Sequence, residues 1–451
     1  MFSSRLPKDL SPSPFFAELE RVKTCAKKDA AEGGLSFIDM TVSSPVKAGL
    51  SVDLNAAVDE GRESFGCWNP DAAGWKSARE AVVEYYRERG GNFTAGQIIL
   101  TASTSEAYSV LFKTFCDPGD VILTPMPGYP LLDTLAQLEH LECAPYFLQL
   151  RRENARKLAT DERREGAAFR FVLDSDSLLA APERAKILLL VSPHNPTGHC
   201  ISREEWNAAV RFCEENGMVL VVDEVFGDYA FSDKVKRTWE YVFGLCPPEP
   251  SLSQSSPSKS FSAEGRKSIH CRFNDFWDAG GGDFINLPED GPKCPIFWLN
   301  GLSKAVGSPQ LKLGWMAFYA PRERFEEIRA ALEFVEDAYL SVSAPAQALG
   351  SALLKQSAAY ESRVKERLLQ NWQTLREAFP SKYCPEVLGG WYAVVRLGED
   401  DEDLTLRLLR EKHVLVQPGF FFDFDEDGWV VISLLQEPAL FKEAVRRMAD
   451  R

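Results

Sequence analysis

Residues 297–315, FWLNGLSKAVGSPQLKLGW, join a short apolar run to a lysine in a turn. Phe297–Asn300 is typical of a buried strand in a parallel sheet, and Lys304 follows it in a loop bounded by glycine and proline. A lysine at such a position can be withdrawn from water, which lowers its pKa and frees its amine for Schiff-base chemistry. A solvated loop lysine is the alternative for Lys304 considered alone.

Four further apolar runs predict buried strands earlier in the chain: Ile98–Thr101, Val121–Thr124, Ile187–Val191 and Met218–Val222. Helical patterns separate them, such as SAREAVVEYYRERGG at 77–91, whose apolar residues share one face. This alternation predicts an α/β fold with a mostly parallel sheet covered by helices on both faces. Ligands of such sheets bind at the carboxyl ends of the strands, so we expect the site directly after each strand.

The first two strand ends carry groups suited to a phosphate and a flat ring. Ser103, Thr104 and Ser105 open a helix, where free amides, hydroxyls and the helix dipole favour a phosphate. A simple capping box between Ser103 and Glu106 is the alternative. Tyr129, in PMPGYP, follows the next strand and could stack on a flat cofactor, or could be a core or turn tyrosine.

The next two strand ends carry an amide and a carboxylate. In SPHNPTG, two prolines and a glycine predict a rigid turn that holds the Asn195 amide in place, and a turn without further role is the alternative. Asp223 ends a buried strand, where a carboxylate requires a cationic partner. A protonated pyridine nitrogen is one such partner, and a helix N-terminus or an arginine is another.

Taken together in this order, these strand ends resemble those of the fold-type I pyridoxal-phosphate enzymes, and among them the class I/II aminotransferases. The matching motifs are TASTSEA, PMPGYP, SPHNPTG, VVDEVF and LSKAVGSPQLKLGW, and the resemblance runs from about Phe37 to the C-terminus. It implies a large domain with a mostly parallel sheet flanked by helices, plus a smaller α+β domain. It also implies that pyridoxal 5'-phosphate is bound and that an amino group passes between an amino acid or amine and a 2-oxo acid.

The resemblance assigns roles to individual residues. Lys304 forms the Schiff base, Asp223 pairs with the pyridine nitrogen, Asn195 binds the ring hydroxyl and Tyr129 stacks on the ring. The other implied cofactor contacts are Ser103, Thr104, Ser105, Phe226, Ser303 and Lys312. Lys312 stands where the family usually has a phosphate-binding arginine, so it keeps the charge but loses the bidentate fork.

Several positions depart from the family pattern. Phe226 replaces a tyrosine that usually donates to the ring hydroxyl, and Gly301 replaces a phosphate-binding serine found in many relatives. The most consequential departure is Val431, in GWVVIS, which stands where an arginine usually binds the substrate carboxylate. Lys47 and Arg396 are the candidates for replacing that charge.

Composition limits the other properties of the chain. Its 451 residues, 45% hydrophobic, predict at least two domains. We expect an N-terminal arm at 1–50 that joins the small domain, a large domain at 51–325 and a C-terminal small domain at 326–451. A Ser-, Gly- and Pro-rich stretch at about 232–295 predicts a loop-rich insertion in the large domain.

The partners and location follow from charge and cysteine usage. A net charge of −15 argues against nucleic acid, and no apolar stretch approaches the length of a membrane helix. Ten cysteines without CxxC pairs or zinc-like spacing predict reduced thiols in a cytoplasmic protein and no metal site. By resemblance, we expect a homodimer with a shared active site, to which Trp68 of the partner contributes.

Two other functions use the same motifs. A β-lyase, or another fold-type I enzyme that does not transaminate, would also need Lys304 and Asp223. A non-catalytic regulator on this fold is the third alternative, although such regulators typically carry a DNA-binding module for which this acidic chain has no room. Retention of the lysine and the aspartate also favours an enzyme.

Overall fold

The computed structural model describes residues 3–7, 11, 13–154, 167–243, 288, 291–398 and 400–450. Its helices are α1 (Pro14–Ala31), α2 (Leu54–Gly61), α3 (Lys76–Arg87), α4 (Thr104–Phe115), α5 (Leu131–Leu138), α6 (Arg203–Asn216), α7 (Glu240–Phe243), α8 (Leu302–Ala305), α9 (Phe325–Asp337), α10 (Ala344–Leu354), α11 (Ser357–Ala378), α12 (Asp401–Lys412) and α13 (Pro438–Ala449). Its strands are β1 (Ile38–Asp39), β2 (Ile98–Thr101), β3 (Val121–Met126), β4 (Glu142–Asn154), β5 (Ala167–Leu173), β6 (Ala185–Val191), β7 (Val219–Asp223), β8 (Ile296–Gly301), β9 (Gly314–Tyr319), β10 (Tyr392–Arg396), β11 (Val414–Leu415), β12 (Gln417–Pro418) and β13 (Trp429–Ser433).

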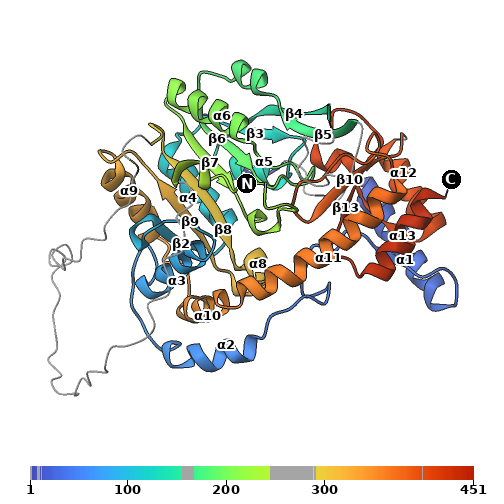
Figure 1. Cartoon of the computed structure of the whole chain (residues 1–451), viewed down its shortest axis with the longest axis horizontal. Helices are drawn as coiled ribbons and strands as arrows, with labels where there is room; N and C mark the ends of the chain where they lie inside the picture. The colour runs from blue at the N-terminus through green and yellow to red at the C-terminus, as the bar shows by residue number, and fades with distance from the viewer. Residues whose placement is uncertain are drawn as a thin grey trace.

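An eight-stranded sheet in the order β2-β9-β8-β7-β6-β3-β4-β5 forms the centre of the molecule (Figure 1). The strands from β8 to β4 pair in parallel, whereas β9 is antiparallel to β2 and β8, and β5 is antiparallel to β4. The five predicted strands are confirmed as β2, β3, β6, β7 and β8. The α/β fold expected from the alternating pattern is therefore confirmed.

The central strands are apolar along their length because both faces of the sheet are covered. Every residue of β8 is buried, as are all residues of β6 except Lys186. Helices α3 and α4 pack against β2, while α6 packs against β7. Burial of both faces explains why these strands show continuous hydrophobic runs and not an alternating pattern.

A second group of elements lies beside the large sheet. β13 pairs antiparallel with β10 and β12, and β1 of the N-terminal arm pairs with β11. α1 packs on α12, and the long helix α11 runs from α10 beside the large sheet to this second group (Figure 1). The domain boundaries after residues 50 and 325 stay a prediction. The predicted insertion lies largely at 244–287 and 289–290, outside the described residues.

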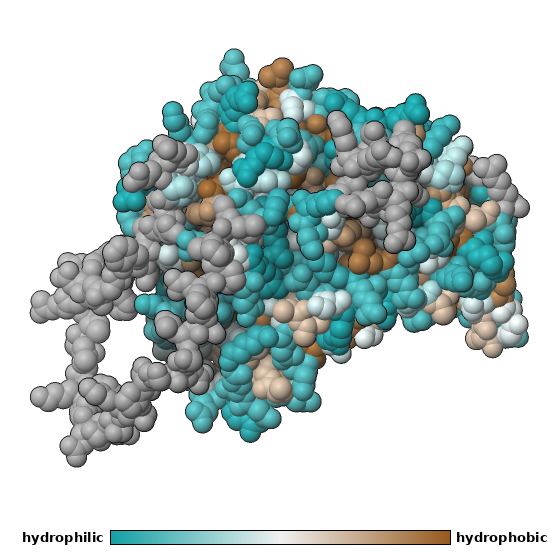
Figure 2. Space-filling model, in the orientation of Figure 1, coloured by the Kyte–Doolittle hydropathy of each residue, from teal (hydrophilic) through white to brown (hydrophobic). Residues whose placement is uncertain are grey.

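Within the described ranges, no helix is both long and apolar enough to cross a bilayer. The face of the molecule drawn in Figure 2 is mainly hydrophilic, with hydrophobic residues in small groups.

Candidate active site

The ends of several strands meet at one edge of the large sheet. Thr101, the last residue of β2, and Gly301, the last residue of β8, both pair with Gly314 at the start of β9. Asp223, the last residue of β7, pairs with Leu299 of β8. The residues that follow β2, β7 and β8 in the chain therefore lie close together, although the sequence separates them widely.

Lys304 lies in α8, one turn beyond the end of β8. Its Nζ is 4.6 Å from the ring centroid of Trp391 and 5.4 Å from that of Phe226. Burial lowers the pKa of Lys304 to about 8, and the negative charge of Asp223 opposes this shift. The Tyr229 hydroxyl donates to the Lys304 carbonyl oxygen over 2.6 Å and fixes the backbone. More of the amine is thus unprotonated near neutral pH than in a solvated lysine, as a nucleophilic lysine requires.

The Asp223 carboxylate is held from two directions. The Tyr108 hydroxyl donates to its Oδ2 over 2.6 Å, and the Val225 amide donates to its Oδ1 over 3.0 Å. Burial raises the pKa of Asp223, while these two hydrogen bonds and the charge of Lys304 act in the opposite direction. The site thus combines a carboxylate and an amine that influence each other's charge.

Asn195 lies in the tight loop after β6. The loop is closed by two backbone hydrogen bonds, from Gly198 N to His194 O (2.8 Å) and from His194 N to His199 O (2.7 Å). The Asn195 Oδ1 atom is buried and has no hydrogen-bond partner in the part of the chain that the structure describes. A buried amide without a partner is costly, so this side chain is suited to a ligand.

Tyr129 follows β3 and keeps 46% of its surface exposed. The neighbouring Gly128 amide donates to the Phe422 carbonyl over 2.8 Å, which attaches this loop to the turn before β13. Burial, and next the charge of Asp223, raise the pKa of the Tyr129 hydroxyl. A residue that stacks on a flat cofactor would have to lie close to Asp223 and keep part of its ring exposed, as Tyr129 does.

The N-terminus of α4 provides the anion-binding end of the site. The Ser103 hydroxyl accepts from the Glu106 amide over 3.2 Å, so this side chain does cap the helix. The hydroxyls of Thr104 and Ser105 have no partner among the described residues, and amides in a first helical turn have no acceptor within the helix. A Cβ on Gly314 would lie 3.1 Å from the Ser103 carbonyl carbon, so only glycine lets β9 approach α4 this closely.

The structure gives a reason for one departure from the family pattern and places two neighbouring residues. A Cβ on Gly301 would lie 3.0 Å from the Leu313 carbonyl oxygen, so a serine there would be crowded. Lys312 is exposed and has a left-handed backbone with φ of 52°, two residues before Gly314 at the α4 terminus. Ser303 is half-buried beside Lys304 in α8.

These groups fit the cofactor that the resemblance implies. The amine of Lys304 suits a carbonyl carbon, Asp223 suits a ring nitrogen, and the Asn195 Oδ1 atom, which has no partner among the described residues, suits a ring hydroxyl. The open first turn of α4 suits a phosphate. Pyridoxal phosphate carries all four of these chemical groups.

The structure does not bring every candidate to this site. Arg396 pairs with Glu426 and lies four residues along β10 from Tyr392, about 13 Å at 3.3 Å per residue. The amine of Lys47 is exposed and makes no ion pair within the described ranges. Trp68 is 80% exposed, and Val431 is fully buried in β13.

Two residues of the site were not singled out from the sequence. Tyr108 shares the buried face of α4 with core residues, so its pattern is that of a packing tyrosine. Trp391, which precedes β10, lies beside Phe226 with its ring centroid 4.6 Å from the Lys304 amine. The local signal for Trp391 is the pair of glycines before it, since glycines often mark places where the backbone packs closely against another segment.

The chain was compared with known proteins. The family model for aminotransferase class I and II matches residues 56–268 and 273–448. A glutamate-pyruvate aminotransferase of Haemophilus influenzae is 21% identical over 93% of this chain and 91% of its own length. An alanine aminotransferase of Mycobacterium bovis is 24% identical over 84% of this chain and 77% of its own length. The solved alanine aminotransferase of Pyrococcus furiosus, 20% identical, superposes with a TM-score of 0.70 over 97% of this chain and 98% of its own.

Proposed function

The chain belongs to the aminotransferase class I and II family and is a pyridoxal-phosphate-dependent aminotransferase, and we propose that Lys304 is the residue that carries its cofactor. The observation behind this proposal is the environment of the amine. Lys304 lies just beyond the end of a buried strand, its amine beside the neighbouring rings of Phe226 and Trp391, and burial lowers its pKa to about 8. Transfer of an amino group is also the function that the named relatives share, which favours it over the lyase and regulator alternatives.

We propose the following contacts with the cofactor. Asp223 faces the ring nitrogen, Asn195 binds the ring oxygen and Tyr129 covers the ring. The remaining contacts come from Ser103, Thr104, Ser105, Phe226, Ser303 and Lys312. When bound, pyridoxal phosphate supplies an electron sink for the bond that breaks at the substrate Cα. The Lys304 amine would take the proton from that carbon as a general base and deliver it as a general acid to the cofactor's C4′ carbon, which receives the amino group.

The experiment that tests this proposal is borohydride reduction followed by peptide mapping. The wild-type protein should bind the cofactor with a visible absorbance band, and reduction should fix it to the peptide that contains Lys304. Lys304→Ala should lose the band and the fixed label, whereas Lys312→Ala should keep the label on Lys304. A reducible attachment to another lysine in the Lys304→Ala protein would overturn the assignment.

We further propose a homodimer in which Trp68 of the partner subunit reaches the phosphate end of the site. The support within this chain is the tryptophan itself, because 80% of its surface is exposed and a large apolar ring gains from burial. The division into an arm, a large domain at 51–325 and a small domain at 326–451 is part of the same proposal. None of the eight described cysteines forms a disulfide, which supports a cytoplasmic location.

The substrates are an amino acid and a 2-oxo acid, and we propose that Lys47 binds a substrate carboxylate in place of the missing arginine. Ser43, four residues before Lys47, forms a hydrogen bond with Tyr392, whose ring lies 6.0 Å from that of Phe226. The residues shortly before Lys47 therefore border the site, and the Lys47 side chain itself is exposed. A lysine would bind the carboxylate as a point charge, with looser geometry than a guanidinium fork.

A further inference from the structure

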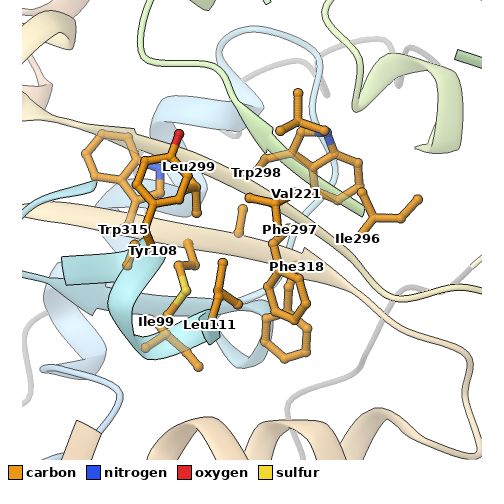
Figure 3. Close-up of a cluster of buried hydrophobic side chains, with 14 of the residues drawn as sticks. Ile99, Tyr108, Leu111, Val221, Ile296, Phe297, Trp298, Leu299, Trp315 and Phe318 are labelled. Carbon is orange, nitrogen blue, oxygen red and sulfur yellow. The ribbon is translucent and has the colours of Figure 1, made fainter. Parts of the chain in front are cut away.

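Tyr108 is buried on the inner face of α4, and its hydroxyl is directed at Asp223. The ring is 4% exposed and lies 6.1 Å from that of Phe112. Figure 3 shows the hydroxyl oxygen pointing away from the apolar side chains of Ile99 and Leu111. The 2.6 Å distance between this oxygen and Asp223 Oδ2 is typical of a hydroxyl that donates to a charged carboxylate.

The hydrogen bond favours the charged form of Asp223. Burial alone disfavours a carboxylate, and a donor fixed in the protein compensates for part of the lost water. Burial and the adjacent charge of Asp223 hold the pKa of Tyr108 well above its usual range, so the phenol keeps its proton and remains a donor. The other ionisable groups that act on Asp223 are Lys304, from α8, and Tyr129, from the loop after β3.

The position of Tyr108 in α4 connects the two ends of the site. Thr104 and Tyr108 are four residues apart, so they lie on the same side of the helix, separated by about 6 Å along its axis. The first turn of α4 is the proposed phosphate site, and the next turn contacts Asp223. One rigid helix thus fixes the distance between the phosphate end and the carboxylate.

We propose that Tyr108 is a positioning residue that holds Asp223 as an anion toward the cofactor's ring nitrogen and thereby keeps the proton on that nitrogen. This inference rests on the proposed role of Asp223. The physical reason concerns the sharing of one proton between two bases. A carboxylate that accepts a strong hydrogen bond is a weaker base, so the proton stays on the nitrogen. Without the Tyr108 hydroxyl, the carboxylate becomes more basic and takes a larger share of the proton.

The test is ¹⁵N NMR of the holoenzyme reconstituted with pyridoxal phosphate labelled at the ring nitrogen. Wild type should give the signal of a protonated nitrogen, and Tyr108→Phe should move it toward the unprotonated value. The variant should also lose about tenfold or more in kcat with KM changed less than about threefold, because the substrate contacts remain. Tyr146→Phe is the matched control, since Tyr146 is also buried and its hydroxyl donates to the Leu189 carbonyl over 2.9 Å and not to Asp223. It should keep the wild-type signal.

Several results would overturn the inference. One is a Tyr108→Phe protein with the wild-type signal and wild-type kcat, and another is a Tyr146→Phe protein whose signal moves as far. A measurement on the unmodified holoenzyme needs no variant: the ¹³C signal of the Asp223 carboxyl should be that of a carboxylate, and a carboxylic acid would contradict the proposal. Asp223→Asn distinguishes a failure of the proposed role of Asp223 from a failure of the Tyr108 inference. If the ring nitrogen stays protonated in Asp223→Asn, the role of Asp223 itself fails. If it stays protonated in Tyr108→Phe but not in Asp223→Asn, the Tyr108 inference alone fails.

Discussion

Replacement of Glu336 by glutamine should stabilise the protein at neutral pH. Glu336 lies near the end of α9, is 2% exposed, and its Oε1 has no hydrogen-bond partner in the described chain. Burial, and next the neighbouring carboxylate of Glu106, raise the pKa of Glu336 from 4.5 to about 8. The unfolded chain therefore releases this proton from about pH 4.5, whereas the folded chain keeps it until about pH 8. The free energy of unfolding consequently decreases as the pH rises through this window.

The magnitude follows from the width of the window. Between pH 4.5 and pH 7 lie 2.5 pH units, and at 1.36 kcal/mol per unit the lost stability is about 3 kcal/mol. A glutamine has no proton to release, but its buried amide keeps part of the desolvation cost. We therefore expect Glu336→Gln to gain about 1–3 kcal/mol near pH 7, with little or no gain below the unfolded pKa of the glutamate.

Denaturant unfolding of both proteins below pH 4.5, near neutrality and above pH 8 measures this difference. The matched control is Glu333→Gln, on the same helix and with the same change of charge. Glu333 lies 2.8 Å from Arg329, so its replacement breaks an ion pair and should cost about 1 kcal/mol or less. The reasoning is refuted if Glu336→Gln is less stable than wild type near pH 7, or if its gain does not depend on pH.

Two further predictions concern other charged groups. Asp228→Ala removes the buried carboxylate that lies 2.9 Å from Arg89 Nε and 2.9 Å from Arg237 Nη2, and should lower the free energy of unfolding by about 3–5 kcal/mol in denaturant titrations. Asp59→Ala, which breaks an exposed pair with Arg62, should cost about 1 kcal/mol or less in the same assay, and equal losses would contradict this account. Lys47→Ala should raise KM for a carboxylate substrate at least about tenfold, or about 1.4 kcal/mol, with the cofactor spectrum unchanged. An unchanged KM in steady-state assays would instead favour an amine substrate without that carboxylate.

The core of the fold could be predicted from the sequence because its strands are buried on both faces. Continuous apolar runs identified β2, β3, β6, β7 and β8 to within two residues at each end. The pattern does not single out β4 and β5, because β5 is the edge strand and the second half of β4, which pairs with β5 alone, carries charged residues such as Arg151 and Arg152. β9 is fully buried and pairs antiparallel with β2 and β8. Its direction depends on these long-range pairings and cannot be predicted from a local pattern.

The same distinction applies to the site. Lys304 and Asp223 could be found because each lies at or a few residues beyond the end of a predictable strand. Tyr108 could not, because its contact with Asp223 spans 115 residues and depends on where α4 packs. Trp391 is likewise placed against Lys304 by the packing of the C-terminal segment on the large sheet. Local sequence patterns thus identify site residues at the ends of strands. They do not identify site residues that other elements bring to the site by packing.

Val431 shows what the pairing of strands adds to a sequence pattern. In the antiparallel pair of β10 and β13, Val431 lies opposite Val394. Residues two apart on a strand share a face, so Val431 lies on the same face as Tyr392, whose ring contacts Phe226 beside Lys304. Val431 thus shares a strand face with Tyr392 and is fully buried in the core there, where an arginine would have to lose its hydration. We infer that β13 contributes shape and no charge to substrate binding, so discrimination between substrates depends on groups from other segments.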